Sequence, residues 1–199
     1  MQPNPEVAGH RKAEHDISPI FLNRWSPSAM TSGEISEKQL MSLLEAGRWA
    51  PSSYNNQPWR FIYGLRGTPA WDLLFGLLGD YNRKWAANAS ALVMVISKKT
   101  FDFNGKPSKT HSFDTGAAWM SIALEASIRG FAAHGMEGFD YDKARTELGI
   151  PNDYDVEAMF AVGIRAPREN LPPDLAKRET PSGRKPLKEI VMEGRFREK

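Results

Sequence analysis

The sequence predicts an α+β fold, in which helices flank a mixed β-sheet, and three observations support this prediction. Apolar runs at residues 59–64, 91–98 and 156–164 have the length and composition of strands. Longer amphipathic or apolar stretches, typical of helices, lie between them. Helices and strands do not alternate regularly, which disfavours a sheet built from parallel βαβ units.

The first long helix is expected to begin near Ser36. Gln39 lies three residues after this serine, which is the spacing of a capping box. Leucines in the following turns supply one apolar face, and Pro51 ends the helix. Residues 59–64 then follow as a strand.

The middle of the chain contains a weak helix, a buried strand and a long apolar helix. Residues 71–79 indicate a helix that Gly76 weakens. The strand at residues 91–98 is almost continuously apolar, which is typical of a strand covered on both faces. After a polar loop, residues 113–133 predict a helix that is apolar nearly all round. We expect such a helix to be buried.

The last third begins with a short helix at residues 141–149, which Gly149 closes. A buried strand at 156–164 follows. The chain is polar and proline-rich after Pro167, and residues 184–191 are expected to form an edge strand or an arm.

Length and composition indicate one globular domain. We expect residues 1–18 to form a mobile N-terminal arm, and residues 19–199 to form a single domain with a C-terminal arm. The net charge of +2 balances 26 basic against 24 acidic residues, so no nucleic-acid partner is expected. The absence of cysteine excludes disulfides, iron–sulfur clusters and a thiol nucleophile. No signal peptide and no membrane-spanning run is found, and we expect a cytoplasmic protein without a membrane partner.

The common catalytic and nucleotide-binding motifs are missing. The four histidines are scattered without the spacing of metal ligands, so no metal is expected. The sequence contains no G-x-S-x-G nucleophile elbow, no GxxxxGK[ST] loop and no GxGxxG loop. Any phosphate would therefore be bound by arginine side chains and backbone amides.

Two arginines are candidates for that role. In FLNRWSPSAM, Ser26 and Ser28 follow Arg24, and a guanidinium with nearby hydroxyls suits a phosphate. The alternative is an ordinary loop arginine with solvated serines. Arg184, in SGRKPL, is the second candidate, and its alternative is a charge in a solvated tail.

The segment APSSYNNQPWRF, residues 50–61, carries more hydrogen-bonding side chains than a turn needs. Ser52, Ser53, Asn55 and Gln57 offer donors and acceptors within six residues, and the flanking prolines stiffen their backbone. Such a loop suits the edge of a flat heteroaromatic ring. The alternative is a turn that satisfies its own polar groups.

The segment HGMEGFD, residues 134–140, directly follows the predicted long helix. Its two glycines lie three residues apart, and they let a backbone pass close to a ligand. A compatible interpretation is a helix C-cap with Gly135 at the C′ position.

In this order, the four segments resemble the nitroreductase family of FMN-dependent oxidoreductases. That family has an R-x-S segment, A-P-S-x-x-N-x-Q-P-W, an E-G-F-D-like turn and a basic R-x-P-L-like arm. The corresponding residues here are 24–26, 50–59, 137–140 and 184–187. The resemblance extends from about residue 19 to 191, and residues 50–59 are its most specific part.

The resemblance implies a flavoprotein fold with a mixed, mainly antiparallel sheet and a homodimer with FMN at the subunit interface. The helix at 113–133 would be the central dimer helix. Arg24 and Arg184 would bind the FMN phosphate, and the loop at 50–59 would line the flavin of the partner subunit. The full set of implied cofactor-binding residues is Arg24, Trp25, Ser26, Ser28, Pro51, Ser52, Ser53, Asn55, Gln57, Asn82, Met136, Glu137, Gly138 and Arg184.

Two further roles follow from the resemblance. Asn82 would hydrogen-bond the pyrimidine edge of the flavin. Met136, Glu137 and Gly138 would place backbone against the ring near N5. No catalytic side chain is implied, because the flavin carries the hydride chemistry.

The sequence departs from the family pattern at three positions. Ser28 stands where a lysine or arginine is frequent, and Ser182 stands where a lysine is frequent. Trp85 stands where some members carry a lysine linked to nicotinamide binding. Lys84 or Lys185 could substitute for the missing cations.

The resemblance implies hydride transfer from NAD(P)H through flavin N5 to a nitroaromatic, a quinone or a similar small-molecule acceptor, with ping-pong kinetics. One alternative is a specialised branch, a reductive dehalogenase or a flavin-destroying enzyme. Residues 99–112 are the lid candidate, but they contain no tyrosine and no glutamate, which argues against a dehalogenase. The other alternative is a non-enzymatic, FMN-binding redox sensor.

Overall fold

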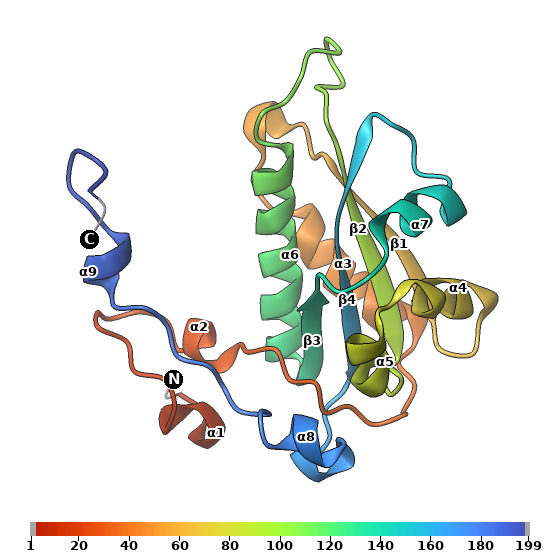
Figure 1. Ribbon diagram of the computed structural model, residues 1–199. Coiled ribbons are helices and arrows are strands. Elements are labelled where there is room, and N and C mark those ends of the chain that lie inside the picture. Colours follow the sequence, from red (N-terminus) through yellow and green to blue (C-terminus); the bar gives the residue numbers. More distant parts are fainter. Residues whose placement is uncertain (1–2, 198–199) are drawn as a thin grey trace.

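The computed structural model describes residues 3–197 and shows a four-stranded sheet with helices on both faces (Figure 1). The strands are β1 (Trp59–Leu65), β2 (Ala91–Lys98), β3 (Phe131–Met136) and β4 (Tyr154–Ile164), in the spatial order β1-β2-β4-β3. The predicted α+β class is confirmed. All neighbouring strands within the described part of the chain pair antiparallel, so the parallel component of a mixed sheet is not found there.

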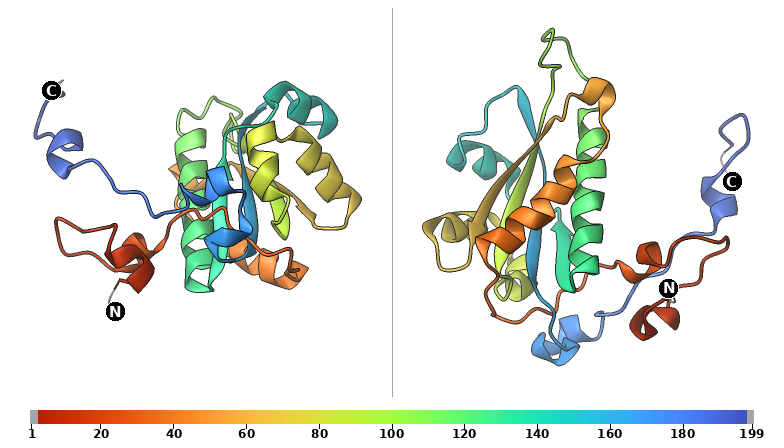
Figure 2. Two further views of the ribbon diagram at one scale, coloured as in Figure 1. Left: turned by 60° about the horizontal axis from the view of Figure 1, so that its bottom comes forward. Right: turned by 180° about the vertical axis from the view of Figure 1, so that it is seen from behind.

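The longer helices form two layers around the sheet. α3 (Glu37–Arg48) and α6 (His111–Ile128) cover one face, while α4 (Pro69–Leu77), α5 (Asp80–Ala86) and α7 (Tyr141–Glu147) cover the other (Figures 1 and 2). Four short helices lie nearer the chain ends: α1 (Pro5–Ala8), α2 (Ile20–Asn23), α8 (Pro173–Ala176) and α9 (Leu187–Ile190). Single 3₁₀ turns lie at Ser53–Asn55 and Arg168–Asn170.

β2 belongs to both hydrophobic cores, which confirms the prediction of a strand covered on both faces. Its side chains alternate between the faces because successive residues of a strand point in opposite directions. Leu92, Met94 and Ile96 pack in the core beneath α4 and α5, while Val93 and Val95 pack beneath α3 and α6. β2 is therefore a central strand of the sheet, paired with β1 on one side and with β4 on the other.

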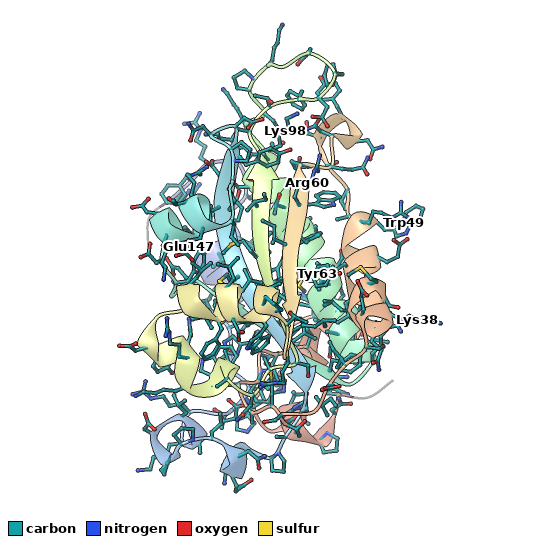
Figure 3. The ribbon with its side chains drawn as sticks, turned by 90° about the vertical axis from the view of Figure 1, so that its right-hand side faces the viewer. Lys38, Trp49, Arg60, Tyr63, Lys98 and Glu147 are labelled. Carbon is teal, nitrogen blue, oxygen red and sulfur yellow. The ribbon has the colours of Figure 1, made fainter. Side chains whose placement is uncertain are left out.

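The predicted capping box of α3 is confirmed. The Ser36 hydroxyl accepts a hydrogen bond from the Gln39 backbone N–H at 3.2 Å, and the Gln39 side-chain oxygen accepts one from the Ser36 N–H at 2.8 Å. The helix ends at Arg48. Trp49 then projects away from the sheet with 74% of its surface exposed (Figure 3).

The helix predicted at residues 113–133 is wrong at its C-terminal end. α6 ends at Ile128, Gly130 turns the chain with φ +77°, and residues 131–136 form the edge strand β3. Apolar residues continue on both sides of this glycine, so the hydrophobic pattern alone does not show the break. Gly135 lies within β3, so its assignment to a helix C′ position is also wrong.

The two chain ends lie beside each other at the edge of the molecule (Figure 1). The Leu187 N–H donates to the Glu14 carboxylate at 3.3 Å, which joins the two ends. Residues 187–190 form α9, so the expectation of an edge strand there is wrong, and that of an arm stays a prediction. Glu6, in the N-terminal arm, pairs with Arg165 at 2.5 Å. The mobility of this arm stays a prediction.

His134 is a buried titratable group on β3. Its ring lies against Trp85 of α5, with 4.5 Å between ring centroids, and its Nδ1 lies 3.4 Å from the Ser28 hydroxyl. Burial lowers the pKa of His134, and a hydrogen bond to the backbone of Pro27 opposes this shift. The neutral imidazole is therefore the form that the fold favours.

Two glycine-to-alanine substitutions should change the free energy of unfolding in opposite directions, one through packing and the other through helix propensity. A Cβ at Gly64 would lie 2.5 Å from the Trp71 backbone nitrogen, so Gly64→Ala should lower the free energy of unfolding by about 1–3 kcal/mol. A Cβ at Gly76 of α4 would meet no atom within 4 Å. Gly76→Ala should therefore raise the free energy of unfolding by about 0.5–1 kcal/mol. Urea unfolding measures both, and equal effects would contradict the packing argument.

Acidification should destabilise the protein through His134. A histidine in an unfolded chain has a pKa of about 6.5, and the pKa of His134 in the fold is lower. Near and below this pH the unfolded chain therefore binds more protons than the folded protein. The stability due to this group is therefore lost as the pH falls. His134→Gln should reduce the loss of urea stability between about pH 7.5 and 5.5, while His15→Gln, at an exposed histidine, is the control. An identical pH dependence of wild type and His134→Gln would contradict the assignment.

Candidate functional site

The candidate site begins with residues 24–31, an extended segment whose backbone is held from outside. Beside the end of β4, the Thr31 N–H donates to the Ile164 carbonyl at 2.9 Å, and the Ala29 carbonyl accepts from the Ala166 N–H at 3.1 Å. The Glu179 carboxylate accepts from the N–H groups of Ser28 and Ala29, both at 2.8 Å. The segment is thereby fixed between the sheet and the C-terminal part of the chain.

Arg24 lies at the start of this segment and is half-buried. Its Nε is buried without a hydrogen-bond partner among residues 3–197, and its Nη1 lies 3.4 Å from the Ser26 hydroxyl. Burial, and then the positive charge of Arg184, lowers the pKa of Arg24. Arginine nevertheless stays protonated in proteins. The structure thus brings Arg24, Ser26 and Arg184 together as a positive site with a free donor, which suits an anion.

Trp25 and Arg184 have surroundings that the sequence did not indicate. The Trp25 ring is buried under the guanidinium of Arg165, at 4.9 Å from its centroid, so it packs at the base of the N-terminal arm. Arg184 is exposed, and its Nη1 donates to the Gly183 carbonyl at 2.8 Å and the Ser182 hydroxyl at 3.2 Å. Only Arg184 of these two lies in the positive site.

A cavity of about 510 Å³ lies between α6 and the strands β3 and β4. Met136 and Glu137, from the predicted set, line it. Thr115 of α6 also lines it, and its hydroxyl is buried without a hydrogen-bond partner in the described part of the chain. A Cβ at Gly135 would lie 3.3 Å from the Trp119 ring, so glycine here allows β3 and α6 to approach each other.

Sequence reasoning missed four polar residues of this cavity, which are Ser112, Thr115, Tyr141 and Glu157. Burial, and then the negative charges of Glu137 and Glu157, raises the pKa of Tyr141. No signal in the sequence distinguishes Thr115 from the other polar residues of α6, such as Asp114 and Ser121. Tyr141 and Glu157 belong to no motif, and only the fold brings them to the cavity.

Asn82 is tied to Gly138 rather than free. Its Nδ2 donates to the Gly138 carbonyl at 3.0 Å, and its Oδ1 accepts from the indole N–H of Trp85 at 3.3 Å. The Gly79 N–H donates to the same carbonyl. A Cβ at residue 138 would lie 2.9 Å from Asn82 Nδ2, so a larger residue here would displace the Asn82 side chain. These contacts fix the turn after β3 against α5.

Two of the three departures from the family pattern meet in space. Ser28 and Trp85 both contact His134, one through its hydroxyl and the other through its ring. All three groups are uncharged when His134 is neutral. Lys84 and Lys185, considered as substitutes for the missing cations, are exposed.

The loop at residues 51–57 has a constrained backbone. Tyr54, Asn55 and Gln57 have φ values of 51°, 53° and 49°, a left-handed conformation that is uncommon for residues other than glycine. Such strain persists only where surrounding contacts enforce it, and it is frequent at ligand-binding sites. Pro51 is exposed at the start of the loop.

Part of this loop hydrogen-bonds its own polar groups, as the alternative interpretation predicts. The Ser52 hydroxyl accepts from the Gln57 N–H at 3.0 Å, and the Gln57 side chain donates to the Asn55 carbonyl at 3.0 Å. The side chains of Ser53 and Asn55 make no hydrogen bond to residues 3–197. These two side chains are therefore free for a ligand.

The loop at 51–57 and the Arg24 segment lie far apart within one chain. The loop contacts the N-terminal end of α6, where the Ser53 N–H donates to Asp114 at 3.0 Å. The Arg24 segment follows α2, which lies near the opposite end of α6 (Figures 1 and 2). α6 has 18 residues, which corresponds to a length of about 27 Å. One chain therefore does not place both groups on one small ligand.

Two further features are absent from residues 3–197. None of their helices combines the length and the apolar character that crossing a membrane requires. They contain no group of three or more histidine, aspartate and glutamate side chains able to hold a metal ion.

Comparisons with known proteins agree with the resemblance. The sequence model of the Nitroreductase family matches residues 22–64 and 70–164. An uncharacterized 15.4 kDa protein from Mycolicibacterium smegmatis is 30% identical over 146 residues, which are 69% of this chain and 97% of that protein. Among solved structures, an oxidoreductase containing FMN is 45% identical, with a TM-score of 0.90 over 95% of this chain and 97% of its own. A protein from Desulfovibrio desulfuricans in complex with FMN is 25% identical, with a TM-score of 0.68 over 92% of this chain and 100% of its own.

The matched residues include the parts of the chain that build the candidate site. They contain Arg24, the loop at 51–57 and the turn after β3. The match covers more than half of the sequence and extends over all four strands. The chain therefore belongs to the nitroreductase family.

Proposed function

We propose that the protein is an FMN-dependent oxidoreductase that takes hydride from NAD(P)H and reduces a nitroaromatic, a quinone or a similar acceptor by ping-pong kinetics. The observation that carries the proposal is the half-buried Arg24, whose Nε has no partner among residues 3–197 and which lies beside a second arginine. Similarity to an oxidoreductase containing FMN, at 45% identity over nearly the whole chain, supports the choice of cofactor.

The residues present fit FMN at both of its ends. The positive site at Arg24 and Arg184 suits the phosphate, which needs several donors and positive charge. The cavity between α6 and β3 suits the ring, because it combines apolar walls with the unpartnered hydroxyl of Thr115. FMN, when bound, supplies the hydride chemistry, and the chain supplies binding and orientation.

Several side chains would set the orientation at the ring. Asn82 and the N–H of Gly79 hold the Gly138 carbonyl, so the turn after β3 is rigid before any ligand arrives. Phe160, which packs in the core beneath α6, gives the cavity an apolar wall. No general acid or base is required of the protein for hydride transfer, which agrees with the lack of a catalytic motif in the sequence.

The proposal includes a homodimer in which the loop at 51–57 completes the site of the partner. The separation of this loop from Arg24 along α6 supports a two-chain site. The outer face of α6 supports it as well, because Phe113 is 81% exposed and Ile128 is 65% exposed. Together with Met120, these side chains form an apolar stripe that a second copy would cover. The cytoplasmic location stays a prediction.

A second candidate function is a redox sensor that binds FMN but reacts poorly with nicotinamides. The observation that favours it is the neutral group of Ser28, Trp85 and His134, which occupies two positions where the family resemblance leads us to expect cations. Loss of these charges would weaken the attraction for the phosphates of a nicotinamide dinucleotide. The two candidates differ in reaction with NAD(P)H and not in FMN binding.

Arg24→Ala should weaken FMN binding by about 1.5–3 kcal/mol, because it removes a charge-assisted hydrogen bond to the phosphate. Fluorescence titration of the apoprotein measures the effect. Arg168→Ala, at an exposed arginine, is the control for general loss of charge. Riboflavin lacks the phosphate, so its affinity should not change. Unaltered FMN affinity in Arg24→Ala would show that the phosphate site is elsewhere.

Anaerobic mixing of the FMN-loaded protein with NADH or NADPH should bleach the flavin absorbance at a rate that saturates with nicotinamide. Addition of a nitroaromatic or a quinone should then restore the colour. Stopped-flow absorbance measures both half-reactions separately and identifies the preferred donor. A bound flavin that neither nicotinamide bleaches would contradict the oxidoreductase and favour the redox sensor.

A further inference from the structure

Arg11, in the N-terminal arm, joins three parts of the chain around the positive site. Its Nη1 donates to the carbonyls of Leu22 at 2.8 Å and of Arg24 at 2.7 Å. Its Nε donates to the carbonyl of Ser182 at 2.9 Å. The arm is thereby tied to the backbone of Arg24 and to the segment that carries Arg184.

These hydrogen bonds do not neutralise the charge of Arg11. All three acceptors are backbone carbonyls, and Arg11 forms no ion pair within residues 3–197. Burial, and then the positive charges of Arg184 and Arg24, lowers the pKa of Arg11. Three guanidinium groups thus lie within electrostatic reach of one another, and the net effect on Arg11 from its charged neighbours is repulsive.

Such a cluster is unfavourable unless an anion binds to it. The third nitrogen of the Arg11 guanidinium, Nη2, makes no hydrogen bond within the described residues. Arg11 and Arg184 also line the same cavity, of about 690 Å³, between the two chain ends. The free Nη2 donor therefore lies beside an open space, which the Glu14 carboxylate also lines.

We propose that Arg11 is a third phosphate-binding arginine, which contacts the FMN phosphate through Nη2 together with Arg24 and Arg184. This inference rests on the proposed FMN site. It assigns a ligand-binding role to the N-terminal arm. It also accounts for Ser182, a departure from the family pattern, because Arg11 brings a positive charge to the carbonyl of that residue. A phosphate monoester carries between one and two negative charges near neutral pH and can accept from several guanidinium groups.

The test compares FMN with riboflavin in titrations of the apoprotein. Arg11→Ala should lower the affinity for FMN by about tenfold or more and leave that for riboflavin unchanged. Arg168→Ala removes the same charge from an exposed arginine that does not line this cavity, and it should change neither affinity. Unchanged FMN affinity in Arg11→Ala, or equal losses for FMN and riboflavin, would overturn the proposal.

A double-mutant cycle with Arg24→Ala separates direct contact from positioning. If Arg11 only holds the Arg24 backbone, Arg11→Ala should have no effect once Arg24 is alanine, and the proposal fails. If Arg11 contacts the phosphate, FMN affinity should fall several-fold further in the double variant. A loss in Arg24→Ala with none in Arg11→Ala would overturn this inference alone. No loss in either variant would overturn both this inference and the proposed phosphate site.

Discussion

The anchoring of residues 24–31 is the constraint on which the rest of the candidate site depends. This segment has almost no regular secondary structure, so its conformation comes from partners elsewhere in the chain. Ile164, the last residue of β4, and Ala166, two residues further on, bond to its backbone, and the Glu179 carboxylate accepts from two of its N–H groups. Because these contacts use backbone atoms of the segment, the side chains of Arg24 and Ser26 remain available. A rigid support with free side chains is what a preorganised anion site requires.

The length of α6 separates the two groups of proposed cofactor-binding residues and is therefore the reason to propose a site formed by two chains. Its N-terminal end holds the loop at 51–57 through Asp114, and its C-terminal end leads into β3 and the turn that Asn82 fixes. The buried face of α6 packs on the sheet, while Phe113, Met120 and Ile128 remain exposed on the outside. The apolar stripe thus lies on α6, and the strained loop with its unpaired side chains contacts the N-terminal end of the same helix. A second chain that covers the stripe could also bring its loop to the first chain's cavity.

The local patterns of the sequence were enough to predict most of the fold. The strand at 91–98, the capping box at Ser36 and the C-terminal turn at Gly149 all follow from short-range rules, and the structure contains each of them. The prediction failed where two elements of similar apolar character adjoin, because a single glycine at 130 separates α6 from β3. The candidate site was harder to predict. Motifs indicated Arg24 and the loop at 51–57, but Arg11, Thr115 and Glu157 reach the site only through tertiary contacts.

The charges of the proposed site are distributed unequally between its two ends. The proposed phosphate end holds Arg11, Arg24 and Arg184. The group of Ser28, Trp85 and His134 beside Asn82 is uncharged, and the cavity proposed for the ring is lined by the carboxylates of Glu137 and Glu157. Charge–charge attraction acts mainly on the phosphate, so most of the electrostatic affinity would come from a part of the cofactor that does not react. The ring would then be held by shape, by the rigid turn at Gly138 and by the cavity under α6. Binding strength and the electronic environment of the reacting ring could therefore change independently in this chain, because separate residues control them.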